Sequence, residues 1–370
     1  YVQAGAVVDL EPLLADPATG LGKEALDDFF PAMLETNRYP DLGNKMYSFP
    51  FAKSVLVMYY NKKVLADAGF PGPPKTWDEF LEQCRQIKVK TGKAAYPINV
   101  DCSTINGMIY SLGGDIVRGH ESLYDAPPAT RVFQLIETLT KEGLAYQITP
   151  DTYDDRVALA QDRAAFAFRS SSHRTSMETL MQGDHSRWGI APIPQGDPAN
   201  PHTVLYGPNV VVFSTTPEQQ RSAWAFVKFF TSPEIAARWS LGTGYMPVRK
   251  SVAQNPEIQK FWSEWPDNRT AFDCLASARP EPNIAGWQKV RDIVEQNETA
   301  ILTGMKTADQ AIRDIKQAAD AALRQAQTGV PGARSPSVTS RKCFRVGISA
   351  RIESIIGAAS AVATMAQARL

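Results

Sequence analysis

The chain has 370 residues, of which 44% are hydrophobic and 21% charged, and its formal net charge is zero. This length and composition predict a globular protein that is large enough to bury two hydrophobic cores. No run of 18 apolar residues predicts a membrane-spanning helix, and 33 basic against 38 acidic residues in positions 1–330 argue against a nucleic-acid partner.

The first part of the chain predicts a series of short elements. A helix is expected at residues 22–34 and a strand at residues 45–51. Residues 55–60 form an apolar, β-branched and aromatic run, which is typical of a strand buried on both faces. A short helix at 62–69 ends at a glycine, and residues 71–74 include three prolines that form a stiff linker. This order suits a chain that crosses between two lobes.

Thr76 is a good N-cap for a helix at residues 77–91, whose first turn carries Asp78 and Glu79 where the helix dipole favours acids. Strands alternate with helices from there on, which predicts an α/β fold with mostly parallel sheets covered on both faces. Further strands are expected at 96–100, 164–168, 188–193 and 210–214, and further helices at 129–142, 170–182, 219–230, 233–241, 284–303 and 306–326.

Several of these segments match the pattern of one protein family. The YYNK…AG…PPKTW pattern of residues 59–77 resembles the extracellular solute-binding proteins of bacterial ABC importers, in the branch that takes up sugars and glycerol phosphates. The later segments DRAAFAFRSSS, WGIAPIPQG, YGPNVVVF, AWAFVKFFTSPEIAARWSLGTGYMPVRKS and RDIVEQNETAILTGMKTADQAI follow in the family's order. The resemblance covers about residues 1–327 and implies a two-lobe periplasmic-binding-protein-like fold of type II.

The resemblance also implies how the chain divides into lobes. The N-terminal lobe would comprise residues 1–61 and 205–245, and the C-terminal lobe residues 62–204 and 246–327. The chain would cross between the lobes near Asn61, near Tyr206 and at residues 244–247, with the ligand in the cleft between them.

Both ends of the chain differ from the family's pattern. The chain opens without an initiator methionine or a signal peptide. We therefore expect that the first part of the N-terminal lobe is missing, and that this chain binds ligand weakly or not at all. Residues 328–370 match nothing in the family, and we expect a disordered or frame-shifted tail, with a genuine extension as the alternative.

The glycerol-phosphate branch of the family implies six ligand-binding residues. Ser54 stands before the first crossing strand, Gly207 offers a backbone donor, and Tyr245 lies in the GYMP loop. The others are Arg291, which opens the RDIV helix, and Arg169 and Ser170 at a serine-rich helix start. An arginine fork with hydroxyls and free backbone N–H groups suits a phosphate. Arg169 stands at or beside the family's serine, so the ligand remains open between a phosphorylated glycerol and a neutral oligosaccharide.

Each of these residues also has a structural interpretation. Ser54 can bond its own backbone, Ser170 can serve only as a cap, and Tyr245 can pack the hinge. Arg291 can form a surface ion pair with the nearby Asp292 and Glu295. Two tryptophans lie in the same part of the pattern. Trp77 is expected to pack beneath the crossing, and Trp287 is a candidate aromatic platform beside the cleft.

No catalytic or metal-binding pattern accompanies these segments. No GxSxG, P-loop, GxGxxG or HExxH spacing is present, so we expect no catalytic residues, no cofactor and no metal. The predicted function is the periplasmic or cell-surface binding component of an ABC importer, acting as a monomer with permease transmembrane subunits. The alternatives are a carbohydrate-active enzyme, such as a glycoside hydrolase or lyase, and a non-transport sensor of the same fold. The scattered cysteines, expected to be buried free thiols, are Cys84, Cys102, Cys274 and Cys343.

Overall fold

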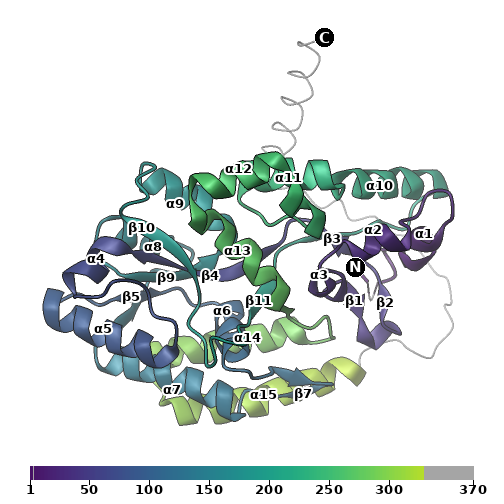
Figure 1. Ribbon diagram of the computed structural model, residues 1–370. Helices are drawn as coiled ribbons and strands as arrows, with labels where there is room; N and C mark the ends of the chain where they lie inside the picture. Colours follow the sequence, from purple (N-terminus) through teal and green to yellow (C-terminus); the bar gives the residue numbers. More distant parts are fainter. Residues whose placement is uncertain (3, 329–370) are drawn as a thin grey trace. The chain divides into compact units, whose positions relative to one another are not determined.

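The computed structural model describes residues 1–2 and 4–328 (Figure 1). The predicted tail lies outside the described residues, apart from Thr328 at the end of the last helix. Within residues 1–2 and 4–328, no helix combines the length and apolar character that crossing a membrane requires. The three cysteines of this part, Cys84, Cys102 and Cys274, are buried and free.

A mixed five-stranded sheet lies at the centre of the fold. Its long strand β4 (Ser54–Asn61) pairs antiparallel with β9 (Phe166–Ser170), β10 (Trp188–Pro192) and β11 (Thr203–Tyr206). β11 also pairs, in parallel, with β13 (Ala278–Pro280). The prediction of mostly parallel sheets is therefore wrong. The chain leaves β4 and returns beside it in the opposite direction, and the alternation of helices and strands along a sequence does not fix that direction.

The two faces of β4 belong to two different hydrophobic cores. Leu56 and Met58 face one cluster, whereas Val55, Val57 and Tyr59 face the other, and all five are fully buried. This alternation is the expected consequence of the two-residue repeat of a strand. The predicted strand, buried on both faces, is confirmed.

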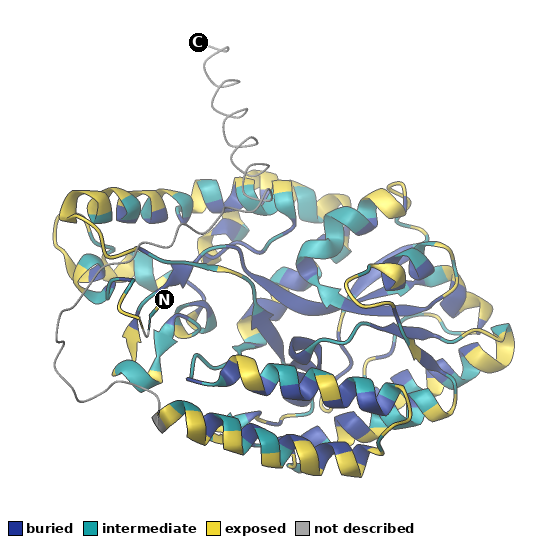
Figure 2. Ribbon diagram, turned by 180° about the vertical axis from the view of Figure 1, so that it is seen from behind, coloured by how far each residue is buried: buried dark blue, intermediate teal, exposed yellow. Residues whose placement is uncertain are grey.

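Helices cover both faces of this sheet (Figure 1). Figure 2 shows that their exposed residues point outward and that the sheet beneath is buried. The first core is covered by α5 (Trp77–Thr91), α6 (Cys102–Ser111), α7 (Pro127–Lys141), α14 (Trp287–Leu302) and α15 (Ala308–Thr328). The second is covered by α10 (Pro217–Phe230), α11 (Pro233–Thr243), α12 (Pro256–Glu264) and α13 (Thr270–Asp273).

Local capping explains where the best-predicted helix begins. α5 starts and ends at the predicted residues, because Thr76 and Glu79 form a capping box and Gly92 adopts the left-handed conformation beyond the last turn. Trp77 is buried and its indole N–H donates to the hydroxyl of Ser111 over 2.9 Å, so it packs as expected.

Two predicted elements are broken in the structure, and one helix was not predicted. The expected helix at 22–34 is split into α2 (Lys23–Asp27) and α3 (Pro31–Glu35), because Phe30 before the proline is extended. The expected strand at 45–51 is two short pieces, β2 (Lys45–Met46) and β3 (Phe49–Pro50). α6 was missed because all ten of its residues are buried, so it shows no amphipathic repeat.

Smaller elements complete the described chain. The helices are α1 (Glu11–Ala15), α4 (Lys62–Asp67), α8 (Asp154–Ala160) and α9 (Arg174–Leu180), and the strands are β1 (Arg38–Tyr39), β5 (Tyr96–Ile98), β6 (Val117–Arg118), β7 (Glu121–Ser122), β8 (Ala145–Gln147) and β12 (Asn209–Val210).

Candidate functional site

Three distant chain segments meet at the first residues of β4. Ser54 pairs with Tyr206, and Lys53 forms an isolated bridge with Met246, whose N–H donates to the Lys53 carbonyl over 2.7 Å. Gly207 is the point of closest approach. Its φ is +112°, and a Cβ there would overlap the carbonyl oxygen of Ala52 and lie 3.2 Å from the Cα of Lys53. This turn therefore requires glycine.

The serine-rich segment and the Tyr245 loop lie beside this meeting point. Ser170 pairs with Leu56 of β4 and caps the short 3₁₀ turn that follows, with its hydroxyl 2.7 Å from that of Ser172. A Cβ at Gly244 would lie 3.1 Å from the carbonyl oxygen of Ser172, which places the neighbouring Tyr245 next to this segment. Four of the six predicted ligand residues, Ser54, Ser170, Gly207 and Tyr245, therefore gather at one end of β4.

Two of these residues have side-chain hydroxyls that are free. Within the described chain, neither the hydroxyl of the buried Ser54 nor that of the partly buried Tyr245 has a hydrogen-bond partner. The Tyr245 ring stacks on Trp239 with a centroid distance of 6.4 Å, which fixes its plane. The Tyr245 hydroxyl is therefore accessible to a polar molecule, whereas Ser54 is only 1% exposed and its hydroxyl becomes accessible only if the surrounding segments move apart.

Asn61, the expected first crossing point, does not lie at the meeting point of these segments. Asn61 is at the opposite end of β4, about 23 Å from Ser54 at the usual rise of a strand. It is fully buried, and its side chain caps α4 through the N–H of Val64 at 2.8 Å. The segments around Tyr206 and 244–247 meet residues 53–54 instead, so the three chain passages converge there.

Arg169 points away from this group. Its guanidinium forms a two-bond ion pair with Asp155 of α8, at 2.6 and 2.9 Å, and the two side chains are only 10% and 1% exposed. Successive strand residues point to opposite faces, so Arg169 and Ser170 cannot present their side chains on one side. The structure thus shows Arg169 already neutralised by a buried carboxylate.

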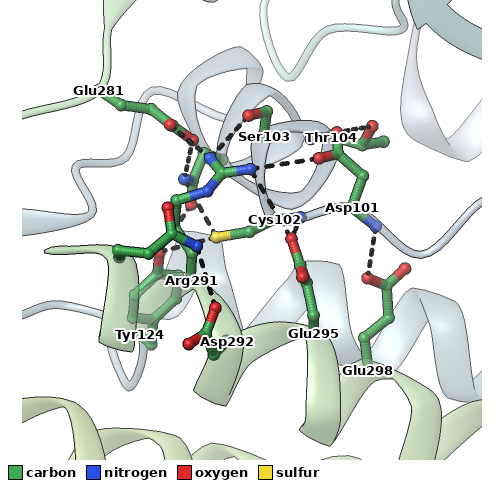
Figure 3. A network of polar contacts seen from close by, with 12 residues as sticks. Asp101, Cys102, Ser103, Thr104, Tyr124, Glu281, Arg291, Asp292, Glu295 and Glu298 are labelled. Atoms are coloured by element: carbon green, nitrogen blue, oxygen red, sulfur yellow. Dashed lines mark hydrogen bonds and ion pairs between the residues drawn. The ribbon is translucent and has the colours of Figure 1, made fainter. Parts of the chain in front are cut away.

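Arg291 lies in a network of carboxylates (Figure 3). Its guanidinium forms ion pairs with Glu281 and, at 3.4 Å, with Asp101, and donates to the hydroxyl of Ser103 at 2.8 Å. Of the two partners expected for a surface pair, Glu295 lies 3.7 Å away. The other, Asp292, instead accepts from Gln288.

The same network holds two acids whose protonation is shifted. Glu298 is buried and accepts the backbone N–H of Asp101 at 3.3 Å, and burial raises its pKa well above the usual range. Burial also raises the pKa of Glu295. Burial, and after it the carboxylate of Asp101, raises the pKa of the Tyr206 phenol, so the network lies close to the residues at the start of β4.

A cavity of about 320 Å³ opens beside Trp287. Tyr39 and Asp41 line it from the N-terminal segment, and residues 282–285 line it from the approach to α14. The indole N–H of Trp287 is buried and has no partner in the described chain. Asp41 accepts the N–H of Ala285 at 2.8 Å, which ties the two walls together.

The sequence analysis overlooked one residue at this site. Lys53 is only 1% exposed, and its ammonium donates to the carbonyl of Gly207 over 3.0 Å. No carboxylate of the described residues lies within ion-pair distance of this ammonium, and burial lowers the pKa of Lys53 to about 7. The signal was available: Lys53 has the same strand phase as Val55 and Val57, which were expected to be buried.

Three or more His, Cys, Asp or Glu side chains able to hold a metal do not gather anywhere in the described chain.

Known proteins resemble this chain over most of its length. The family described as bacterial extracellular solute-binding proteins matches residues 1–270. The sn-glycerol-3-phosphate-binding periplasmic protein UgpB of Rhizobium meliloti is 26% identical over 351 residues, which cover 87% of this chain and 77% of that protein. A binding protein of Brucella abortus is 24% identical over 326 residues, covering 84% and 76%.

Solved structures agree with these relatives in fold. UgpB from Mycobacterium tuberculosis in complex with glycerophosphocholine has a TM-score of 0.75 at 22% identity, covering 88% of this chain and 80% of that one. The cyclic α-maltosyl-1,6-maltose binding protein from Arthrobacter globiformis has a TM-score of 0.74 at 22% identity, covering 87% and 81%. The predicted type II periplasmic-binding-protein fold is confirmed. The predicted loss of the opening part of one lobe stays a prediction.

Proposed function

Because this chain belongs to the family of bacterial extracellular solute-binding proteins, we propose that it is the substrate-binding component of an ABC importer. It captures a glycerol phosphate, a glycerophosphodiester or a sugar outside the cytoplasm. It then delivers this solute, as a monomer, to the transmembrane subunits of a permease. The names of the relatives support this assignment, since they include both glycerol-phosphate and sugar-binding proteins.

The convergence of four chain segments at the start of β4 is the observation that carries the proposal. The hydroxyls of Ser54 and Tyr245 have no partner in the described chain, and the backbone of Gly207 lies close to that of residues 52–53. Ser170 adds a third hydroxyl at the start of a 3₁₀ turn. We assign these four residues to direct contact with the solute. Hydroxyls, backbone groups and one aromatic face are the usual means of binding a polyol in a cleft.

The two arginines have a different proposed role. Arg169 and Arg291 act as positioning residues, because each guanidinium already pairs with carboxylates. Arg169 fixes the strand that leads into the serine segment. Arg291 ties α14 to the N-terminus of α6. The cavity beside Trp287 adds an aromatic wall, and its volume of about 320 Å³ lies at the lower end of the range for small-molecule sites.

Lobe closure is the proposed mechanism. The lobes, taken as residues 1–61 with 205–245 and 62–204 with 246–327, move about the three expected crossings, near Asn61, near Tyr206 and at residues 244–247. A solute that contacts both lobes favours the closed state only by its extra affinity for that state. The closed surface is then the one that docks on the permease.

Thermal unfolding of the purified chain with candidate solutes tests this function. We expect sn-glycerol 3-phosphate, glycerophosphocholine or maltose to raise the Tm at millimolar concentration even if this chain binds weakly, as expected from its sequence, since a ligand at 100 times its Kd adds about 2.7 kcal/mol. The same samples are analysed by chromatography after prolonged incubation. Release of glucose from maltose, or of choline or glycerol from the phosphodiester, would identify a carbohydrate-active enzyme or a phosphodiesterase instead. A Tm unchanged by all three solutes counts against solute binding.

A further inference from the structure

We propose that Lys53 is the residue that receives an anionic group of the bound solute, so that this site selects an anionic solute over a neutral sugar. The inference rests on the proposed function and narrows its solute class. It depends on the position of Lys53 and on the pairing of the other cations near the site.

Lys53 stands at the point where the chain passages converge. Its backbone carbonyl accepts from Met246, its neighbour Ser54 pairs with Tyr206, and its ammonium reaches the carbonyl of Gly207. Both Gly207 and Tyr245 are only partly buried. Lys53 and Ser54 are successive strand residues that point to opposite faces, so the ammonium reaches the proposed contact surface at the carbonyl of Gly207 and not beside the Ser54 hydroxyl.

The ammonium has spare bonding capacity. A lysine ammonium carries three N–H donors, and within the described chain the Gly207 carbonyl is the single acceptor that it contacts. A buried cation with one neutral partner is costly to maintain. An anion placed here would use the remaining donors and supply the missing opposite charge.

The two arginines cannot supply this charge as easily. Arg169 is paired with Asp155 through two bonds, and Arg291 faces three carboxylates. An anion approaching Arg291 would meet Glu281, Asp101 and Glu295 at close range. An anion at Lys53 meets no such competition, because no carboxylate of the described chain lies within ion-pair distance of the Lys53 ammonium.

The protonation of Lys53 gives the proposal a specific signature. Burial lowers its pKa to about 7, so the side chain is mostly neutral at pH 8 in the free protein. The two segments that pack against Lys53, at residues 206–207 and 245–246, carry the titratable phenols of Tyr206 and Tyr245. Burial alone, and no neighbouring charge, shifts the pKa of Lys53. An anion favours the charged form, so binding at pH 8 draws a proton from solution.

Titration calorimetry of the full chain at pH 8, in two buffers of different ionisation enthalpy, measures this proton. The probes are sn-glycerol 3-phosphate, which is fully ionised at this pH, glycerate as a carboxylate, and maltose as a neutral sugar. We expect the anions to bind with uptake of close to one proton, and to bind more tightly at pH 6.5 than at pH 9. Stronger binding of the phosphate than of glycerate would identify the anionic group.

Two variants separate ligand contact from a structural role. Lys53→Arg keeps the charge at all pH values, so it should bind the anions without proton uptake. Lys53→Met should lower anion affinity by about tenfold or more, as for loss of a charge-assisted contact. Unchanged anion affinity in Lys53→Met, or anion binding by the native chain with no proton uptake, overturns the proposal.

The outcomes also separate this inference from the function on which it depends. Binding of maltose but of neither anion would overturn the role of Lys53 and leave the solute-binding function standing. Binding of none of the probes would count against both.

Discussion

Replacing Gly207 by alanine tests whether the chain passages are as closely packed at the start of β4 as the structure indicates. Gly207 has a φ of +112°, which an L-residue adopts only at a cost of about 1–2 kcal/mol. The new methyl group would also overlap the carbonyl oxygen of Ala52, which is backbone and cannot rotate aside. Moving that backbone adds about 1–2 kcal/mol, for a total of about 2–4 kcal/mol.

A second glycine provides the matched control. Gly92, at the end of α5, has a φ of +70°, but nothing lies within 4 Å of the position that a Cβ would take. Gly92→Ala therefore carries the backbone cost alone, about 1 kcal/mol. Urea unfolding followed by circular dichroism measures both variants against the native chain. Equal loss of stability in the two variants would show that the approach of Gly207 to residues 52–53 is not close.

Three further predictions concern the charged groups. Asp155→Asn should lower the free energy of unfolding by about 2–4 kcal/mol, because it leaves the buried Arg169 without its counter-charge. Glu142→Gln, in the exposed two-bond pair with Arg85, should lower it by no more than about 1 kcal/mol. Equal losses in urea unfolding would contradict the burial argument. Arg291→Met should lower the Tm more at pH 8 than at pH 5, because burial raises the pKa of Glu295 and protonation of Glu295 removes one of the negative charges that face Arg291. A pH-independent loss would argue against the network. The folded-state pKa of Glu298 lies above its ordinary value of 4.5, so its contribution to stability is complete below 4.5 and is lost as the pH rises through the folded value. Glu298→Gln keeps the neutral shape and should flatten that decline between pH 4.5 and 8; an unaltered slope would mean that Glu298 is ionised in the folded protein.

The sequence predicted the parts of the fold that local chemistry determines. The capping box of Thr76 and the continuous apolar run of β4 gave correct boundaries, because caps and burial patterns act over a few residues. The direction of strand pairing was wrong, because it depends on how distant segments return to β4. α6 was missed for a related reason, since a helix buried on every side has no polar face to mark its period.

The candidate site could be predicted only in part. The resemblance located Ser54, Ser170, Gly207 and Tyr245, which the structure brings together from distant parts of the sequence. The i,i+4 spacing predicted the pairing of Arg291 with Glu295. Asp155 beside Arg169 and Glu281 beside Arg291 could not be foreseen, because they come from segments whose packing no local pattern specifies. Whether the six residues contact a solute stays a prediction.

The strand at residues 54–61 belongs to both hydrophobic clusters, because the side chains of the two clusters pack on opposite faces of its eight residues. Neither cluster can therefore unfold without affecting the other. Melting of either cluster would strip one side of that strand and expose its apolar residues to water. The chain should therefore lose both clusters in a single heat-absorption peak, and two well-separated peaks in scanning calorimetry would show that they are independent.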